Sequence, residues 1–117
     1  MKVLRARNGV TITLDAHDGD ERLVLETPAG QRITLADGAS SVRIEDSNGN
    51  SIVLESSGIT ITASAKVSVN ASQVQVSAGL IEIDAGMTRV SGTLKCDTLI
   101  ATSVVASSYS PGAGNIW

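Results

Sequence analysis

The chain has 117 residues, enough for one domain, and 42% of them are apolar, yet it contains no Phe, one Tyr and one Trp. Because aromatic side chains normally supply much of the buried area of a globular core, this composition argues against an independent globule and favours a thin, regular core of Val, Ile, Leu and Ala. A formal net charge of −3 without a cluster of Lys or Arg excludes nucleic acid as an evident electrostatic partner, and the single cysteine, Cys96, excludes an intrachain disulfide framework.

The first part of the chain, residues 1–57, alternates turn signals with short apolar segments. The turn signals are Asn8-Gly9, Asp18-Gly19, Ala29-Gly30, Asp37-Gly38, Asn48-Gly49 and Ser57-Gly58. The segments between them predict strands over residues 10–14, 22–27, 32–37, 42–46 and 51–55. Asn-Gly and Asp-Gly turns are typical of hairpins, so a small antiparallel barrel is one interpretation of this part. We favour the start of a continuous stack of strands, because the alternation runs on without a linker.

Residues 58–108 continue as seven-residue repeats that begin at Gly58, Lys66, Gln73, Leu80 and Met87, with one extra residue at Ala65. The second and fourth places of a repeat are two residues apart, so both side chains lie on one face of a strand. A coiled coil would instead space its apolar places three and four residues apart. A small residue at the sixth place and Gly or Ser after it indicate a corner, so each repeat predicts a strand of about four residues and a tight turn.

The inward-facing residues of these repeats are the predicted core of the fold. They are Ile59, Ile61, Val67, Val69, Val74, Val76, Ile81, Ile83 and Val90.

The last segment, residues 109–117, is rich in turn-forming residues and contains both aromatic side chains of the protein. Its predicted functional residues are Ser110, Pro111, Gly112, Ala113, Gly114, Asn115, Ile116 and Trp117. One interpretation is a cap that closes the last strand edges and covers the apolar core with Ile116 and Trp117. The other is a docking end for a partner protein, and both interpretations are compatible.

A strand of about four residues cannot bury its apolar face alone, so it needs neighbouring strands. A single-chain solenoid and an intertwined trimer both meet this need. A solenoid prefers a constant coil length, whereas the turn spacing here falls from about ten residues to seven. We therefore predict an all-β fold: an intertwined triple-stranded β-helix, forming a homotrimeric prism, with about twelve short strands per chain.

The ordered combination of residues 27–35, 42–54 and 58–61 resembles the β-helical part of type VI secretion spike proteins of the VgrG type. Residues 110–117 are similar to the ends of spikes from phage baseplates and from extracellular contractile injection particles. The resemblance covers about residues 20–117 and implies an intertwined triple-stranded β-helix in a homotrimer. Complete spikes begin with a hub and an oligonucleotide/oligosaccharide-binding barrel, which have no counterpart here. The chain is then either a naturally short spike or an excised β-helix, and we favour excision because Met1 is followed at once by strand material.

The resemblance implies a structural role rather than an enzymatic one. The chain is expected to be a spike component of a contractile injection machine or phage tail that pierces a target membrane. It would carry a tip protein of the PAAR type on Ser110–Trp117 and join hub and tube proteins at its N-terminal end. Assembly in the bacterial cytoplasm and delivery with an injection particle or virion follow from that role. The alternative is a trimeric tail-fibre segment that binds a receptor or a glycan.

Residues that could carry chemistry have simpler interpretations. His17 is the only histidine, and we expect a solvated turn residue rather than a metal ligand. Cys96 has no base nearby in the sequence, so we expect a small buried hydrophobe rather than a nucleophile. Glu82 and Asp84 share an outward strand face and predict solvation rather than glycoside hydrolysis. The sequence therefore predicts no catalytic residues, no metal and no cofactor.

Overall fold

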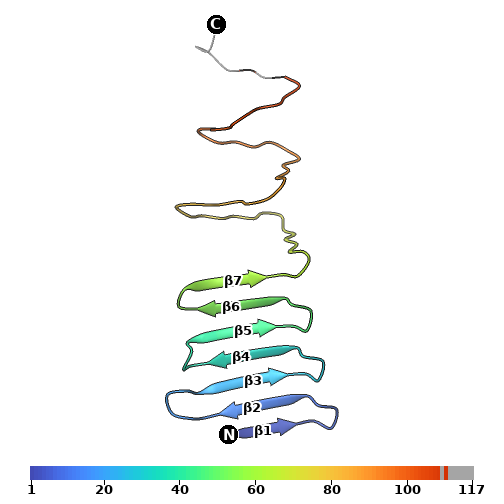
Figure 1. The fold of residues 1–117 in the computed structure, drawn as a ribbon, viewed down its shortest axis with the longest axis vertical. Coiled ribbons are helices and arrows are strands. Elements are labelled where there is room, and N and C mark those ends of the chain that lie inside the picture. The colour runs from blue at the N-terminus through green and yellow to red at the C-terminus, as the bar shows by residue number, and fades with distance from the viewer. Residues whose placement is uncertain (109, 111–117) are drawn as a thin grey trace. The chain divides into compact units, whose positions relative to one another are not determined.

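The computed structural model describes residues 1–108 and 110, and within them it contains strands and no helix. The strands are β1 (Lys2–Arg5), β2 (Thr11–Asp15), β3 (Arg22–Glu26), β4 (Arg32–Ala36), β5 (Ser41–Glu45), β6 (Ser51–Glu55) and β7 (Gly58–Thr62). They form one seven-stranded antiparallel sheet in which each strand pairs with its neighbours in the sequence (Figure 1). The chain divides into two compact units, Met1–Val74 and Gln75–Trp117, and these strands all lie in the first.

The hairpin loops at one end of the strands have the same turn. The loops β1–β2, β3–β4 and β5–β6 each place a glycine at a positive φ, Gly9 at 99°, Gly30 at 100° and Gly49 at 90°. In the middle loop the Thr27 N–H donates to the Gln31 carbonyl at 3.0 Å, and the Gly30 N–H donates to the Thr27 carbonyl at 3.1 Å. A three-residue hairpin loop needs this left-handed residue, which glycine adopts without steric cost. The hairpins that such turns are typical of, which belonged to the alternative interpretation of this part, are therefore present, but they form an open meander with β1 and β7 at its edges rather than a closed barrel.

The loop between β4 and β5 differs from its sequence signal. The turn marked by Asp37-Gly38 is present, but the positive φ falls on Ser40, at 49°, and not on the glycine. Gly38 instead lies close to Asp20, and a Cβ at position 38 would meet the carboxylate of Asp20, which would have to shift. The Asp37 N–H donates to the Glu21 carbonyl at 2.8 Å, which holds the two neighbouring loops together.

The strand register gathers the aliphatic side chains on one face of the sheet. One row crosses all the strands through Leu4, Ile12, Leu25, Ile33, Ile44, Ile52 and Ile61. A second row runs beside it through Leu14, Leu23, Leu35, Val42, Leu54 and Ile59, with Lys2 at its β1 end. We call these two rows the aliphatic face. The sheet is a single layer, and among the described residues only Ala36 and Thr11 are buried.

The seven-residue repeats beyond β7 have corners where the sequence predicts them but no strands. Bends lie at Ser72, Gly79 and Gly86, seven residues apart. Within the described residues the structure has seven strands, whereas the sequence pattern predicts about twelve. A strand exists only as part of a hydrogen-bonded ladder, and residues 63–108 form no ladder with each other or with β7 in the single chain.

Candidate trimerisation surface

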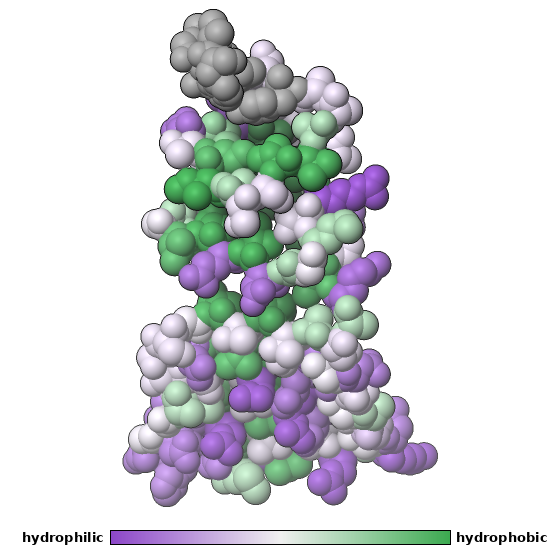
Figure 2. Space-filling model, turned by 45° about the horizontal axis from the view of Figure 1, so that its top comes forward, coloured by the Kyte–Doolittle hydropathy of each residue, from purple (hydrophilic) through white to green (hydrophobic). Residues whose placement is uncertain are grey.

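The aliphatic face is the most unusual surface of the first compact unit because it is apolar and open to solvent. Most of its side chains are exposed, from 37% at Leu25, Ile33 and Leu54 to 68% at Ile59, and three more, Ile12, Leu23 and Val42, are half-buried. Figure 2 shows hydrophobic side chains at the molecular surface with hydrophilic ones beside them. A soluble monomer rarely exposes a contiguous apolar surface of this kind, so the face indicates a missing partner surface.

The opposite face of the sheet is polar and suited to water. Its side chains include a row in which Glu26, Arg32 and Glu45 are paired across β3, β4 and β5. The Arg32 guanidinium lies 3.0 Å from Glu26 and 3.8 Å from Glu45, and Arg43 lies 4.0 Å from Glu45. These groups are half exposed, so each pair contributes at most about 1 kcal/mol. An antiparallel sheet with one apolar and one polar face buries the first and solvates the second.

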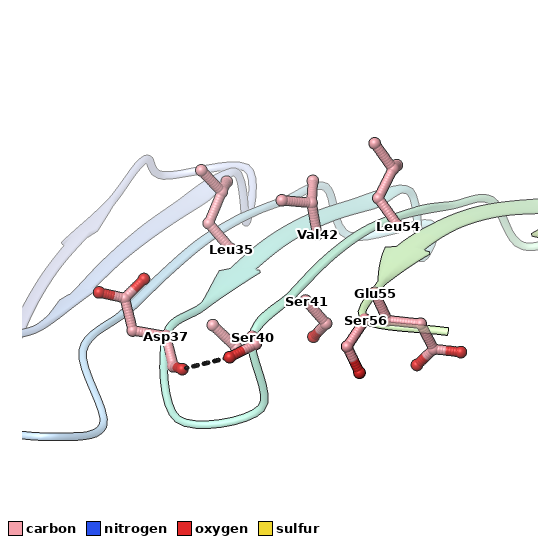
Figure 3. A pocket seen from close by; sticks show the side chains of 9 residues that line it. Leu35, Asp37, Ser40, Ser41, Val42, Leu54, Glu55 and Ser56 are labelled. Atoms are coloured by element: carbon pink, nitrogen blue, oxygen red, sulfur yellow. Dashed lines mark hydrogen bonds between the residues drawn. The ribbon is translucent and has the colours of Figure 1, made fainter. Parts of the chain in front are cut away.

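A hollow of about 640 Å³ lies where the aliphatic face meets the loops of β4–β5 and β6–β7. Leu35, Val42 and Leu54 point to the same side of the sheet here, while the polar side chains of the loops lie along the other part of the lining (Figure 3). The Ser40 hydroxyl donates to the Asp37 carbonyl at 3.5 Å, a long bond within the loop. The lining has no paired acid and base and no nucleophile with a general base, so the hollow offers apolar contact rather than chemistry.

The β5–β6 turn contains a network of side-chain hydrogen bonds centred on Asp46. Asp46 accepts four hydrogen bonds, from the backbone and side chain of Asn50 at 2.9 and 2.8 Å and from those of Asn48 at 3.0 and 3.2 Å. The side-chain bond from Asn50, followed by its backbone bond, lowers the pKa of Asp46 to about 2. Asn50 in turn accepts the Ser64 N–H at 2.9 Å, so this network also holds the chain where it leaves β7.

The same corner contact occurs one hairpin earlier. The Gln31 side chain accepts the Ser47 N–H at 3.2 Å and donates to the Ser47 hydroxyl at 3.4 Å. The residue after Gly30 and the residue after Gly49 therefore each contact a serine at the next corner. Sequence reasoning did not find Asn50 or Gln31, because their partners lie 14 and 16 residues further along the chain. The repeated order of glycine, amide and later serine was the available signal.

The predicted core residues lie on exposed, extended chain segments in the single-chain structure. Their exposed fractions range from 52% at Val90 to 70% at Ile83. Ile59 and Ile61 belong to the aliphatic face, and the others follow it in the seven-residue repeats. Sequence reasoning did not name the aliphatic residues of β1–β6 as core, although each of the strands β2–β6 carries the same two-residue alternation.

Of the predicted C-terminal site, Ser110 is described and exposed, whereas Pro111–Trp117 lie outside the described residues. His17 is an exposed turn residue, as predicted, and its carbonyl accepts the Asp20 N–H at 2.9 Å. Glu82 and Asp84 are exposed. Cys96 is also exposed in the single chain, because no other element of this chain covers it, and the burial of its thiol stays a prediction for the trimer.

The described part of the chain contains neither a cluster of metal ligands nor a helix that could span a membrane. His, Cys, Asp and Glu side chains do not gather there in groups of three or more that would hold a metal ion. Within the same residues, no helix has the length and apolar character needed to cross a membrane.

Comparison with protein families matches residues 22–87 to the phage baseplate V C-terminal trimerisation domain. The matched segment is more than half of the chain and contains β3–β7 and most of the seven-residue repeats. Comparison with curated proteins found no match.

Proposed function

Because the chain belongs to the family of phage baseplate V C-terminal trimerisation domains, we propose that it forms the stalk of a puncturing spike. The family indicates a homotrimer and a structural part of a tail-associated baseplate. The observation that carries this proposal is the open aliphatic face, which spans β1–β7 and has a polar face behind it. Symmetry gives each chain of a trimer the same face, so the copies cover one another around a common axis.

The proposed trimer uses two kinds of strand pairing. In residues 2–62 each chain pairs its own strands, so each meander forms one side of a prism with its aliphatic face inward. Beyond β7 the repeats have no ladder partner within the described chain, and we assign their partners to the two sister chains. This arrangement keeps the intertwined triple-stranded β-helix, which the sequence predicts for the whole chain, only beyond β7. It removes the exposed strand edges that would otherwise template aggregation.

The proposed role is mechanical and needs no catalytic residue or cofactor. Contraction of a surrounding machine pushes the rod end-on against a target membrane. Backbone ladders between chains and a shared aliphatic core break only together, so an axial load does not unravel one chain at a time. The spike would be assembled in the bacterial cytoplasm and delivered as part of a virion or injection particle. Hub and tube proteins would hold the N-terminal end, and Ser110–Trp117 would carry a PAAR-type tip protein.

Neighbouring residues on opposite faces of β6 provide the test of the shared core. Ile52 belongs to the aliphatic face and Val53 to the polar face. Sedimentation of the purified chain should give a trimer, Ile52→Asp should abolish it, and Val53→Asp should retain it. A charge placed at a trimer axis loses hydration without gaining a partner, whereas the same charge at Val53, which is half-buried on the outer face, keeps access to water and lies opposite Arg43. A wild-type monomer, or an Ile52→Asp trimer, would overturn the proposal.

The puncturing role is tested with contractile particles that carry these same variants. Particles with the Val53→Asp chain should permeabilise target membranes as the wild type does, measured by release of an entrapped dye. Particles with Ile52→Asp should assemble a tube but release at least about tenfold less dye, because the rod is not held together. Equal release by both variants would show that membrane penetration does not depend on this rod.

A further inference from the structure

The end of the second compact unit repeats with a period of five residues instead of seven. After the bends at Ser72, Gly79 and Gly86, the later bends lie at the adjacent residues Ser91 and Gly92 and then at Asp97, Thr102 and Ser107. The sequence changes with them, since Gly-Thr-Leu-Lys-Cys, Asp-Thr-Leu-Ile-Ala and Thr-Ser-Val-Val-Ala follow one another from position 92 to 106. Backbone and sequence therefore change period at the same residue.

The five-residue repeat alternates inward and outward side chains as the seven-residue repeat does, but it is two residues shorter. In the longer repeat a small residue precedes the bend, as Ala71, Ala78 and Ala85 do. In the shorter repeat the same place holds Cys96, Ala101 and Ala106. Two residues before them lie Leu94, Leu99 and Val104, which share their strand face because side chains alternate along extended chain.

The exposed fractions agree with this assignment. Leu99 is 67% exposed and Val104 is 61% exposed. Both values lie within the exposed fractions of the inward residues in the longer repeats, which are 52% to 70%. Ile100 and Val105 lie between the inward places and are 94% and 98% exposed. No part of the described chain covers these two side chains, which is expected of residues that point away from the axis.

We propose that the trimer narrows at Gly92, with Cys96, Ala101 and Ala106 facing the axis and Ile100 and Val105 facing outward. The inference rests on the proposed homotrimer. A side of five residues is about 7 Å shorter than a side of seven. The inward side chains shrink in step, from two large and one small per side to one large and one small. Face length and core volume thus change together, as a well-packed prism requires.

The competing arrangement continues the seven-residue register from Leu94. It would place Lys95 and Asp97 toward the axis as the second and fourth places, and Cys96 outward between them. Burying these charges beside their symmetry copies is costly, which is the physical reason for preferring the shorter register. The two arrangements make opposite predictions for the same native thiol.

The test measures alkylation of Cys96 by N-ethylmaleimide in the intact full-length chain. In the shorter register the native thiol should react at least about tenfold more slowly than in the denatured chain, because reaction requires local opening of the rod. An equal rate in the trimer would overturn the inference. Sedimentation of the same sample separates the two proposals, since a monomer would refute the trimer itself, while a trimer with a freely reactive Cys96 would refute only the narrowing.

A matched pair of variants tests the neighbouring positions in a Cys96→Ala background. The thiol introduced by Ala101→Cys should be protected, and the thiol introduced by Ile100→Cys should react at the rate of an exposed thiol. Both are compared only in samples that sediment as trimers. The reverse order of reactivity would overturn the inference.

Discussion

At the residue scale, Asp46 has a clear structural task. Its carboxyl group can accept hydrogen bonds at both oxygens only when it is charged. In that form it organises the β5–β6 turn through Asn48 and Asn50. The bonds from Asn50 and Asn48 lower the pKa of Asp46 from 3.8 to about 2. Protonation of this group therefore opposes folding.

The sign of the pH effect follows from that direction. Since the pKa of Asp46 is lower in the folded chain, its contribution to stability is present above the unfolded pKa of 3.8 and is lost as the pH falls toward about 2. We expect Asp46→Ala to lower the midpoint of thermal unfolding at pH 5 and to have little effect near pH 2. Unfolding followed by circular dichroism at both pH values checks this. A deficit of the same size at both would mean that the charge of Asp46 does not matter.

At the element scale, the corner contacts determine where the meander ends. Gln31 holds Ser47 within a loop whose two flanking strands, β5 and β6, are already paired. Asn50 holds Ser64, which follows β7 and begins the part of the chain without its own ladder. The same type of contact therefore has different consequences at the two corners, because only at Ser64 is it the last intrachain restraint before the repeats.

This difference predicts unequal effects of two matched substitutions. Asn50→Ala should raise amide hydrogen exchange over residues 64–67 by about fivefold, since a hydrogen bond that restrains a chain end contributes on the order of 1 kcal/mol. Gln31→Ala should leave exchange over the equivalent residues 47–50 within about twofold, because β5 and β6 hold that loop. Exchange measured by mass spectrometry on peptides from both corners checks this. Equal effects at the two corners would contradict the role of Asn50.

At the scale of the whole molecule, the aliphatic face and the repeats make the single chain an incomplete fold. Its described residues contain almost no buried side chain, so stability has to come from association. The proposed trimer depends on contacts between residues of different chains, which form slowly and separate slowly. The stability of the trimer therefore depends on its unfolding rate as well as on its free energy of unfolding.

The whole-molecule prediction is resistance of the trimer to heat and to SDS. The unheated wild type should migrate as a trimer in SDS gels, and its apparent melting temperature should rise with the heating rate because unfolding is under kinetic control. Val53→Asp should behave in the same way and serves as the control for added charge. Rapid conversion to monomer at mild temperature, independent of the heating rate, would contradict an interlocked rod.

The amino-acid sequence by itself determined the local features of this protein. Turn glycines such as Gly30 and Gly49 predict the hairpins, and Ala followed by Ser or Gly predicts the corners at Ser72, Gly79 and Gly86, because these features depend on the φ preference and size of one or two residues. Alternation two residues apart also determines which side chains share a face, as it does for Ile59 and Ile61.

Only the tertiary structure decided which strands pair within the chain. A strand carries the same alternation whether its ladder partner is its own hairpin or another copy, so the sequence alone did not show that intrachain pairing stops at Thr62. The positive φ at Ser40 and the contact of Gly38 with Asp20 likewise arise from two loops that meet only after β3 and β4 have paired. Local patterns report conformational preference, whereas pairing and close approach depend on residues far apart in the chain.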